Sequence, residues 1–262
     1  MKPIDTASQP FSGRNVLVTG GGRGIGLAIV RAFLEQGASV VFIDHDQALG
    51  QAAESTLRSE YPRVHFVQAD IASFASCEAA FSRAEALLGS VDTLVNNAGI
   101  SPKTDGRGLG VDEIGIEEWL RVVDVNLNAI FYFCKLAVPG MKRQRFGRIV
   151  SMSSVAGKAY LDVCALHYAA TKAAVIGVTR QLAGELGPHG INVNAIAPGR
   201  IDTEMVAVAG DEVNALYVAQ TPLKRLGTTR EVASLCLYLA SRDEAGFVTG
   251  QVVDVAGGWL MT

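Results

Sequence analysis

Tyr168 and Lys172 are four residues apart in a segment whose small and aliphatic residues recur at helical spacing. On a helix, both side chains emerge on one face, one turn apart. A free phenol has a pKa near ~10, too high for efficient proton exchange at neutral pH, but a neighbouring ammonium lowers it by favouring the phenolate. The pair therefore predicts an acid/base catalyst in which Lys172 tunes Tyr168. Taken alone, the spacing also fits an ordinary solvated helix pair.

Strand and helix patterns alternate along the chain and must position this pair. Short β-branched runs predict strands at NVLVTG, SVVFID, VHFVQAD, DTLVNN, RIVSMS, INVNAIAPG and VVDVAGG. Longer helical patterns lie at 24–37, 47–59, 74–88, 116–138, around Tyr168, and at 230–240. Sequential strands joined by helical crossovers run parallel. The sequence predicts one α/β domain over 1–262, a doubly wound parallel sheet of about seven strands with helices on both faces.

The composition favours a large buried core, with 49% hydrophobic and only 19% charged residues. The net charge is −3 and the basic residues are scattered, so neither nucleic acid nor a membrane surface is a predicted partner. The N-terminal MKPIDTASQPFSG lacks the apolar core of a signal peptide, and no uncharged apolar run is long enough for a membrane span, which predicts a cytoplasmic protein. The four cysteines are widely spaced and do not cluster with the histidines, so no metal site is predicted.

A glycine-rich turn, TGGGRGIG at 19–26, follows the first strand and leads into an apolar helix. Glycines let the backbone approach a pyrophosphate, whose charge meets unpaired N–H groups at the start of the helix. The spacing departs from G-x-G-x-x-G and lacks the GK[ST] ending of a P-loop, and close packing alone could also explain glycines here. The predicted cofactor contacts of this turn are Gly20, Gly22, Arg23, Gly24, Ile25 and Gly26.

Asp44 closes the second strand, 24 residues after Gly20, where an acid can accept hydrogen bonds from an adenosine ribose. A 2′-phosphate there would meet like charge, and two charges ~4 Å apart repel by up to ~4 kcal/mol at an effective dielectric near 20. Arg23 argues the other way, because its guanidinium could hold a 2′-phosphate. We weight Asp44 above Arg23 and predict NAD, with NADP as the alternative. Asp70, which ends the third strand, is predicted to accept from the adenine amino group or, alternatively, to cap a helix.

Motifs that span nearly the whole chain, taken in their order along the sequence, resemble the short-chain dehydrogenase/reductase family, in the branch with one Rossmann-like domain. The matching pieces are TGGGRGIG, Asp70, the NNAG of 96–99, Asn126 in VNLNA, Ser154 in SMSSVAG, Tyr168 and Lys172 in YAATK, and Pro198-Gly199 followed by Thr203. Any one of these motifs could arise by chance. Together, at these spacings, they are specific for the family.

The resemblance implies a role for each catalytic position. Tyr168 is the expected general acid/base, Lys172 lowers its pKa and binds the nicotinamide ribose, and Ser154 hydrogen-bonds the substrate carbonyl or hydroxyl. Asn126 is expected to hold a water that links Lys172 to solvent, or else to bond backbone within its helix. The neighbouring Ser153 is the alternative candidate for this contact with the substrate. These roles fit hydride transfer to a carbonyl, which needs hydrogen-bond donors at the oxygen and one proton.

The resemblance also implies cofactor contacts beyond the glycine turn. The NNAG segment is expected beside the cofactor, and the segment after Pro198 is expected to hold the carboxamide of nicotinamide, although Thr203 could instead be a helix N-cap. The full set of these further contacts is Asp44, Asp70, Ile71, Asn97, Ala98, Gly99, Tyr168, Lys172, Pro198, Gly199, Ile201 and Thr203. A homotetramer is likewise expected from the resemblance.

The substrate pocket is predicted to be mainly apolar, from Leu161, Val163, Cys164, Leu166 and Val206, with a mobile lid over 203–225. Ser154, Cys164, Tyr168 and Val206 are the predicted substrate contacts. The segment 101–115 is longer than is common in the family, so the rim of the pocket is remodelled. We expect an NAD(H)-preferring oxidoreductase that interconverts a secondary alcohol and a ketone. The alternatives are an NADPH-dependent 3-oxoacyl-thioester (acyl-carrier-protein) reductase and a non-catalytic nucleotide-binding sensor.

Overall fold

The computed structural model describes residues 9–104 and 106–262. Residues 1–8 lie outside the described part, and with them most of the N-terminal segment from which a cytoplasmic location was predicted. Residue 105, within the predicted rim segment 101–115, also lies outside it.

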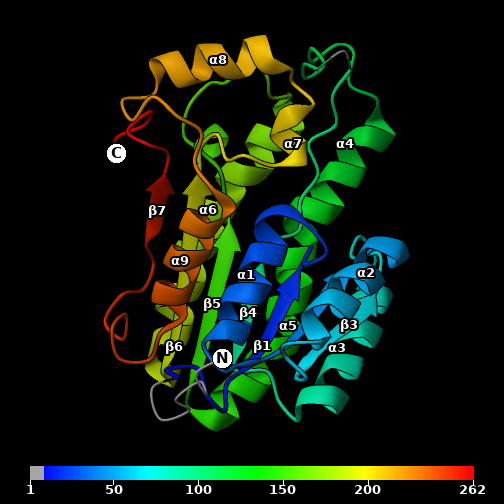
Figure 1. Ribbon diagram of the computed structural model, residues 1–262, viewed down its shortest axis with the longest axis vertical. Helices are drawn as coiled ribbons and strands as arrows, with labels where there is room; N and C mark the ends of the chain where they lie inside the picture. The colour runs from blue at the N-terminus through cyan, green and yellow to red at the C-terminus, as the bar shows by residue number, and fades with distance from the viewer. Residues whose placement is uncertain (1–8, 105) are drawn as a thin grey trace.

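A seven-stranded parallel sheet forms the centre of the molecule, in the order β3-β2-β1-β4-β5-β6-β7 (Figure 1). The strands are β1 Asn15–Thr19, β2 Ser39–Asp44, β3 Val64–Gln68, β4 Thr93–Asn96, β5 Gly147–Met152, β6 Ile191–Pro198 and β7 Val252–Val255. The order reverses direction between β1 and β4, and in open α/β sheets the carboxyl ends of the strands at such a switch point form the ligand crevice. The predicted Rossmann-like fold is confirmed.

Helices cover both faces of this sheet (Figure 1). They are α1 Gly24–Glu35, α2 Gln47–Arg58, α3 Phe74–Leu88, α4 Ile116–Val123, α5 Ala129–Gln144, α6 Leu166–Leu186, α7 Glu204–Ala207, α8 Asp211–Gln220 and α9 Thr229–Ala240. Two buried clusters mark the faces: one joins the sheet to α3, α5 and α6, the other joins it to α1, α2 and α9. Successive side chains of β1 point to opposite faces of the sheet: Leu17 packs in the first cluster, and Val16 and Val18 pack in the second.

Helix α5 runs further than the pattern predicted, since the expected end at 138 precedes Pro139. A proline inside a helix removes one hydrogen bond. The helix nevertheless continues because Phe133, Ala137 and Met141, at successive i+4 positions, are all buried against the sheet. The whole helical run Ile116–Gln144 is long and apolar enough to span a membrane by composition, with an 18-residue window of mean hydropathy 1.3, yet 44% of that window is buried within this fold.

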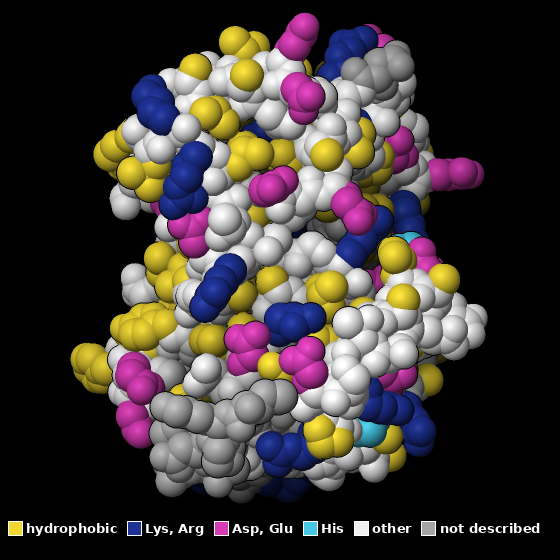
Figure 2. All heavy atoms as spheres, viewed as in Figure 1, with side chains coloured by type: hydrophobic (Ala, Val, Ile, Leu, Met, Phe, Trp, Pro, Cys, Tyr) yellow, Lys and Arg dark blue, Asp and Glu magenta, His cyan; other side chains and the backbone are white. Residues whose placement is uncertain are grey.

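The predicted lid segment carries two helices, α7 and α8, and α8 lies across the end of the molecule where the strand arrows point (Figure 1). Whether this segment moves stays a prediction. On the face shown in Figure 2, basic and acidic side chains alternate with hydrophobic ones. Asp44 ends β2, and Asp70, Asn97 and Ser154 follow the carboxyl ends of β3, β4 and β5, so the fold gathers these predicted site residues at one edge of the sheet.

Candidate active site

Tyr168 and Lys172 lie on the first turns of α6 and face the same way. The Lys172 Nζ is 5.6 Å from the centroid of the Tyr168 ring. Lys172 is buried, and its Nζ donates a hydrogen bond of 2.8 Å to the carbonyl of Met152, the last residue of β5. The lysine is therefore fixed between α6 and the carboxyl edge of the sheet, as its predicted role requires.

Burial shifts the pKa of both members of this pair. Burial raises the pKa of Tyr168 to about 12, the nearby Cys164 thiol adds to the rise, and a hydrogen bond with Ser154 opposes it. Burial also lowers the pKa of Lys172 to about 8. In the protein without coenzyme, the loss of hydration is the largest effect on both groups. The predicted tuning of Tyr168 by Lys172 stays a prediction.

The buried Lys172 predicts a pH dependence of stability. Below pH 8, the ammonium is charged in the folded and the unfolded chain, so folding includes its full desolvation cost. Between about 8 and 10.5, the unfolded chain binds more protons than the folded one. The free energy of unfolding of the wild type, minus that of Lys172→Met, should therefore rise with pH over this interval, as measured by urea unfolding. Lys135→Met, at an exposed position, is the matched control, and its difference in free energy of unfolding should not change with pH. A pH-independent difference for Lys172→Met would contradict the lowered pKa of Lys172.

Ser153 and Ser154 have different partners, which separates the two rivals. Ser153 donates its hydroxyl to the carbonyl of Lys172 at 2.8 Å and so ties β5 to α6. Ser154 Oγ accepts from the Ala156 N–H at 3.1 Å, hydrogen-bonds Tyr168 and lines the pocket. The Ser154 oxygen is held by a backbone donor, and its hydroxyl lies at the pocket in hydrogen-bond contact with Tyr168, so both hydroxyls can reach one substrate oxygen. The geometry favours Ser154 for the predicted substrate contact.

Asn126 lies in a π-helical turn, Asp124–Asn128, between α4 and α5. Its side chain is fully buried and bonds both backbone groups of Ile100, accepting from the N–H at 2.8 Å and donating to the carbonyl at 2.9 Å. The amide also donates to Thr171 Oγ1 at 3.3 Å. The side chain therefore bonds the backbone of the loop after β4 and not that of its own helix, as the alternative from the sequence had it, and it holds this loop beside Lys172. Its predicted water-holding role stays a prediction.

The glycine turn has the shape of a phosphate cradle. Gly20 and Gly24 adopt φ of 67° and 56°, values that favour glycine. Among the described residues, no side chain caps the N-terminus of α1, so the first N–H groups of this helix are available to an anion. A Cβ on Gly26 would lie 1.8 Å from the carbonyl oxygen of Gly20, so the turn closes on the helix without room for a side chain. These features fit the pyrophosphate of a dinucleotide.

Gly26→Ala tests the cradle. The added methyl must push the Gly20 carbonyl away, and overpacking of this kind typically costs about 1–3 kcal/mol. We expect weaker binding of NADH, by roughly tenfold or more where the turn is displaced, measured by isothermal titration calorimetry alongside thermal unfolding. Gly177→Ala on α6 is the matched control, since a Cβ there meets nothing within 4 Å. Unchanged NADH affinity in folded Gly26→Ala would contradict the assignment of the turn.

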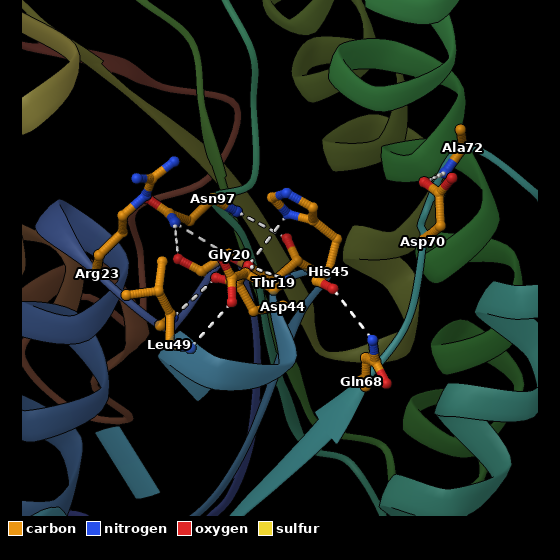
Figure 3. A network of polar contacts seen from close by, with 12 residues as sticks. Thr19, Gly20, Arg23, Asp44, His45, Leu49, Gln68, Asp70, Ala72 and Asn97 are labelled. Carbon is orange, nitrogen blue, oxygen red and sulfur yellow. Dashed lines mark hydrogen bonds and ion pairs between the residues drawn. The ribbon is translucent and has the colours of Figure 1, made fainter. Parts of the chain in front are cut away.

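Thr19 and Asn97 join this cradle to β4 (Figure 3). The Asn97 amide donates to the carbonyls of Thr19 and Gly20 at 3.0 and 2.9 Å, while Thr19 Oγ1 accepts from the N–H groups of Asn97 and Ala98, each at 3.1 Å. A Cβ on Gly99 would lie 3.3 Å from Lys172 Nζ. The glycine turn and Tyr168–Lys172 are thus linked through the NNAG segment. Thr19 is not among the predicted site residues, although its hydroxyl stands at the end of β1 within the glycine motif.

Asp44 lies directly against the glycine turn (Figure 3). Its Oδ2 accepts from the Gly22 N–H at 3.0 Å and its Oδ1 from the Asp46 N–H at 3.2 Å, with His45 Nδ1 also 3.2 Å from Oδ1. Arg23 is instead turned to the surface, where it pairs with Glu204 at 2.8 Å at the start of α7. The structure places Asp44 against the glycine turn and pairs Arg23 with a carboxylate, and the predicted contact of Asp44 with an adenosine ribose stays a prediction.

Asp70 stands apart from the Asp44 cluster (Figure 3). Both of its carboxylate oxygens lie 2.9 Å from Arg121 Nη1 on α4, and Oδ1 also accepts from the Ala72 N–H at 3.1 Å. The hydrogen bond from Arg121 lowers the pKa of Asp70. The neighbouring Ile71 is buried. An adenine contact by either residue stays a prediction, and for Asp70 it would compete with the ion pair.

The segment after β6 approaches the glycine turn from the other side. Gly199 donates to the Val255 carbonyl at 2.9 Å, and Ile201 is buried. Thr203 occupies the N-cap position of α7, but its Oγ1 donates to the Ile201 carbonyl at 3.2 Å, and its Cγ2 would lie 3.6 Å from a Cβ on Gly24. Asp44, predicted to bind the adenosine ribose, and Thr203, predicted to bind the nicotinamide carboxamide, therefore both lie near the glycine turn that begins α1.

A cavity of about 80 Å³ opens beside Tyr168 and Ser154 and is lined by Cys164 and Val206, the two further predicted substrate contacts. Leu161 and Val163 also line it, whereas Leu166 is half exposed on α6. The prediction of a mainly apolar pocket is incomplete, because Lys103 and Arg200 line it as well. In the sequence, these two cations could have been found only from their position, because each follows the carboxyl end of a central strand, β4 or β6.

A family model described as "Enoyl-(Acyl carrier protein) reductase" matches residues 20–260. With the fold and the ordered motifs, this match shows that the chain belongs to the short-chain dehydrogenase/reductase family. It is an NAD(P)-dependent oxidoreductase that acts on a carbonyl or alcohol group.

Three similar proteins are each described as a 3-oxoacyl-[acyl-carrier-protein] reductase. The 3-oxoacyl-[acyl-carrier-protein] reductase FabG of Aquifex aeolicus is 37% identical over 95% of this chain and 98% of its own length. A crystal structure of a 3-oxoacyl-[acyl-carrier protein] reductase from Brucella melitensis has a TM-score of 0.92 and 46% identity, covering 100% of this chain and 98% of that one. A second Brucella melitensis structure, of such a reductase with bound NAD, has a TM-score of 0.90 and 45% identity, with the same coverage.

Proposed function

We propose that this protein reduces the ketone of a 3-oxoacyl thioester to the corresponding 3-hydroxyacyl thioester. The observation that carries the proposal is the group formed by Ser154, Tyr168 and Lys172 at the pocket, together with full-length similarity to proteins described as 3-oxoacyl reductases. This favours the thioester reductase, the alternative from the sequence analysis, over the broader expectation of an unspecified secondary alcohol. The similarity to catalysts also argues against a non-catalytic nucleotide sensor.

The chain's own groups supply everything the carbonyl needs apart from the hydride, which a bound reduced nicotinamide provides. As negative charge develops on the substrate oxygen, Ser154 and Tyr168 donate hydrogen bonds to it. Tyr168 then gives up the one proton that completes the alcohol, and Lys172, with its pKa lowered to about 8, favours the phenolate that remains and exchanges protons near neutral pH. Burial of the phenol keeps Tyr168 protonated until the oxygen becomes basic.

The preferred coenzyme is proposed to be NAD(H). Asp44 contributes a carboxylate beside Gly22, where a 2′-phosphate would be repelled, and Arg23 is paired with Glu204. The NAD in one Brucella melitensis relative is consistent with this choice. NADPH is the alternative and is distinguished by direct comparison of the two coenzymes.

The proposed reaction is tested with a 3-oxoacyl N-acetylcysteamine thioester and the matching trans-2-enoyl thioester, each with NADH and with NADPH. We expect oxidation of one equivalent of NADH and formation of the 3-hydroxyacyl thioester, with the enoyl compound unchanged. The enoyl arm is included because of the description of the matching family model. Reduction of the enoyl compound alone, or oxidation of simple secondary alcohols without reduction of either thioester, would replace the proposal.

We also propose that the protein is a homotetramer and lies in the cytoplasm. Large hydrophobic side chains on α4 and α5, such as Ile116 and Phe131, are exposed at 75% and 59%, which fits burial by another copy in the expected homotetramer. Sedimentation velocity measures the assembly directly. A cytoplasmic location is proposed from the similarity to acyl-carrier-protein reductases and is tested by cell fractionation.

A further inference from the structure

The pocket beside Tyr168 is lined by two cationic side chains and by no aspartate or glutamate among the described residues. Lys103 comes from the loop after β4, and Arg200 from the segment after β6. Both are partly buried in the chain as described. Reduction of a ketone does not itself require either charge, because Ser154 and Tyr168 already supply the donors at the carbonyl. The two cations therefore need a separate explanation.

Arg200 is held in place by groups that do not neutralise it. Its Nε donates to Asn214 Oδ1 at 3.1 Å, its Nη2 donates to the same oxygen, and its guanidinium carbon lies 4.5 Å from the centroid of the Tyr217 ring. An amide oxygen and an aromatic face orient a guanidinium while leaving its charge and remaining N–H donors available. Arg200 is thus prepared for an anion that is not part of its own surroundings.

Within the described residues, neither Lys103 nor Arg200 forms an ion pair with a carboxylate. Asp162 lies near Arg200 and raises its pKa slightly, but its carboxylate accepts the Tyr217 hydroxyl at 2.6 Å. Burial lowers the pKa of both Lys103 and Arg200, and the charge of Arg200 lowers that of Lys103 further. Two like charges in a partly dehydrated pocket destabilise each other, and an anion bound between them would remove that cost.

We propose that Lys103 and Arg200 form an anion subsite for a carboxylate or phosphate carried by the substrate. The inference rests on the proposed function for the 3-oxo group and adds to it the chemical class of the substrate, a 3-oxoacyl compound with an acidic group. The anion has two sources, a carboxylate at the end of the acyl chain or the phosphate of a pantetheine arm. Both sources place an anion in the cavity of about 80 Å³ that the two cations line, and the substrates compared below distinguish them.

The competing explanation is that Arg200 only anchors the lid. Asn214 and Tyr217 both belong to α8, so loss of Arg200 could loosen this helix without any role in substrate binding. A purely structural role lowers kcat/KM for charged and uncharged substrates alike. An anion subsite changes the ratio between them, mainly through KM.

The experiment compares three substrates with NADH: a short 3-oxoacyl N-acetylcysteamine thioester ending in a carboxylate, its methyl ester, and a coenzyme A thioester with an uncharged acyl chain. A hydrogen bond to a charged group contributes about 1.5–3 kcal/mol, so kcat/KM for the preferred anionic substrate should exceed that of the methyl ester by roughly 10- to 100-fold. A gain with the carboxylate identifies the acyl chain as the source, and a gain with the coenzyme A thioester identifies the phosphate.

Arg200→Gln and Lys103→Gln should each bring this ratio towards one, because glutamine keeps polar contacts but removes the charge. Arg230→Gln, at an exposed position on α9, is the matched control and should leave the ratio unchanged. If the wild type reduces all three thioesters with similar kcat/KM, the anion subsite is wrong while the proposed function stands.

If none of the thioesters is reduced, the proposed function fails, and binding then decides the subsite separately. Trp259 lines the pocket, so its fluorescence reports occupancy without turnover. Tighter binding of either anionic thioester than of the methyl ester, lost in Arg200→Gln, supports the subsite. Equal affinities for all three overturn it.

Discussion

Tyr168→Phe is expected to lower kcat for the reduction of a 3-oxoacyl thioester by about 10²–10⁴-fold, the usual contribution of a positioned general acid. The substitution keeps the ring that packs beside Lys172 and removes only the hydroxyl, which shares a hydrogen bond with Ser154. The proton for the substrate oxygen and one of its two hydrogen-bond donors are lost together. Steady-state kinetics with NADH, with NADH binding measured by calorimetry on the same sample, separates the loss of chemistry from a loss of coenzyme.

Tyr160→Phe is the matched control. It removes the same phenolic hydroxyl at a side chain that is 88% exposed and lies outside the pocket. It should retain wild-type kcat. If Tyr168→Phe folds, binds NADH and keeps kcat within a few-fold of the control, another group supplies the proton and the catalytic assignment is wrong.

Asp44→Asn is expected to shift the coenzyme preference towards NADPH. The substitution removes the charge but little of the volume that lies against Gly22. The repulsion removed is at most ~4 kcal/mol before screening, so a partly screened site should change the ratio of kcat/KM for NADPH to that for NADH by roughly 10- to 100-fold. The comparison uses wild type and variant under identical ionic strength, because screening alters the effect.

Both oxygens of Asp44 accept backbone N–H groups, from Gly22 and Asp46, and an asparagine can satisfy only one of them. Some loss of affinity is therefore expected for both coenzymes, and the ratio is the informative quantity. Asp46→Asn controls for charge, because Asp46 caps α2 through the Leu49 N–H and lies outside the glycine turn. A wild type that already prefers NADPH, or a ratio that does not move in Asp44→Asn, would contradict the proposed role of Asp44.

Much of the fold follows from local patterns in the sequence. Each β-branched run became a parallel strand, because strands buried on both faces require apolar residues at nearly every position. Helix α3 has the predicted bounds of 74–88. The end of α5 was predicted too early, since the rule for proline is local whereas the burial of Met141 depends on the sheet. Helix α8 went unrecognised within the predicted lid, because its apolar residues do not recur at helical spacing.

The candidate site was predictable where a residue type and its place at a strand end coincide. Asp44 beside Gly22, and Asn97 beside Gly20, illustrate this. Energies that depend on burial could not be predicted: the pKa of Tyr168 rises because the surrounding chain removes water, which no spacing of residues reveals. Partners distant in the sequence were equally hidden, such as Arg121 on Asp70 and Arg200 in the pocket.

The central claim is that this chain directs a hydride to the carbon bearing the 3-oxo group and a proton to its oxygen. NADH deuterated at the transferred position tests this claim most directly when it is used with a 3-oxoacyl N-acetylcysteamine thioester and the products are examined by mass spectrometry and NMR. We expect one deuterium on the new carbinol carbon of a single 3-hydroxyacyl enantiomer. A product without deuterium at that carbon, or a deuterated saturated acyl thioester formed only from the enoyl compound, would contradict it.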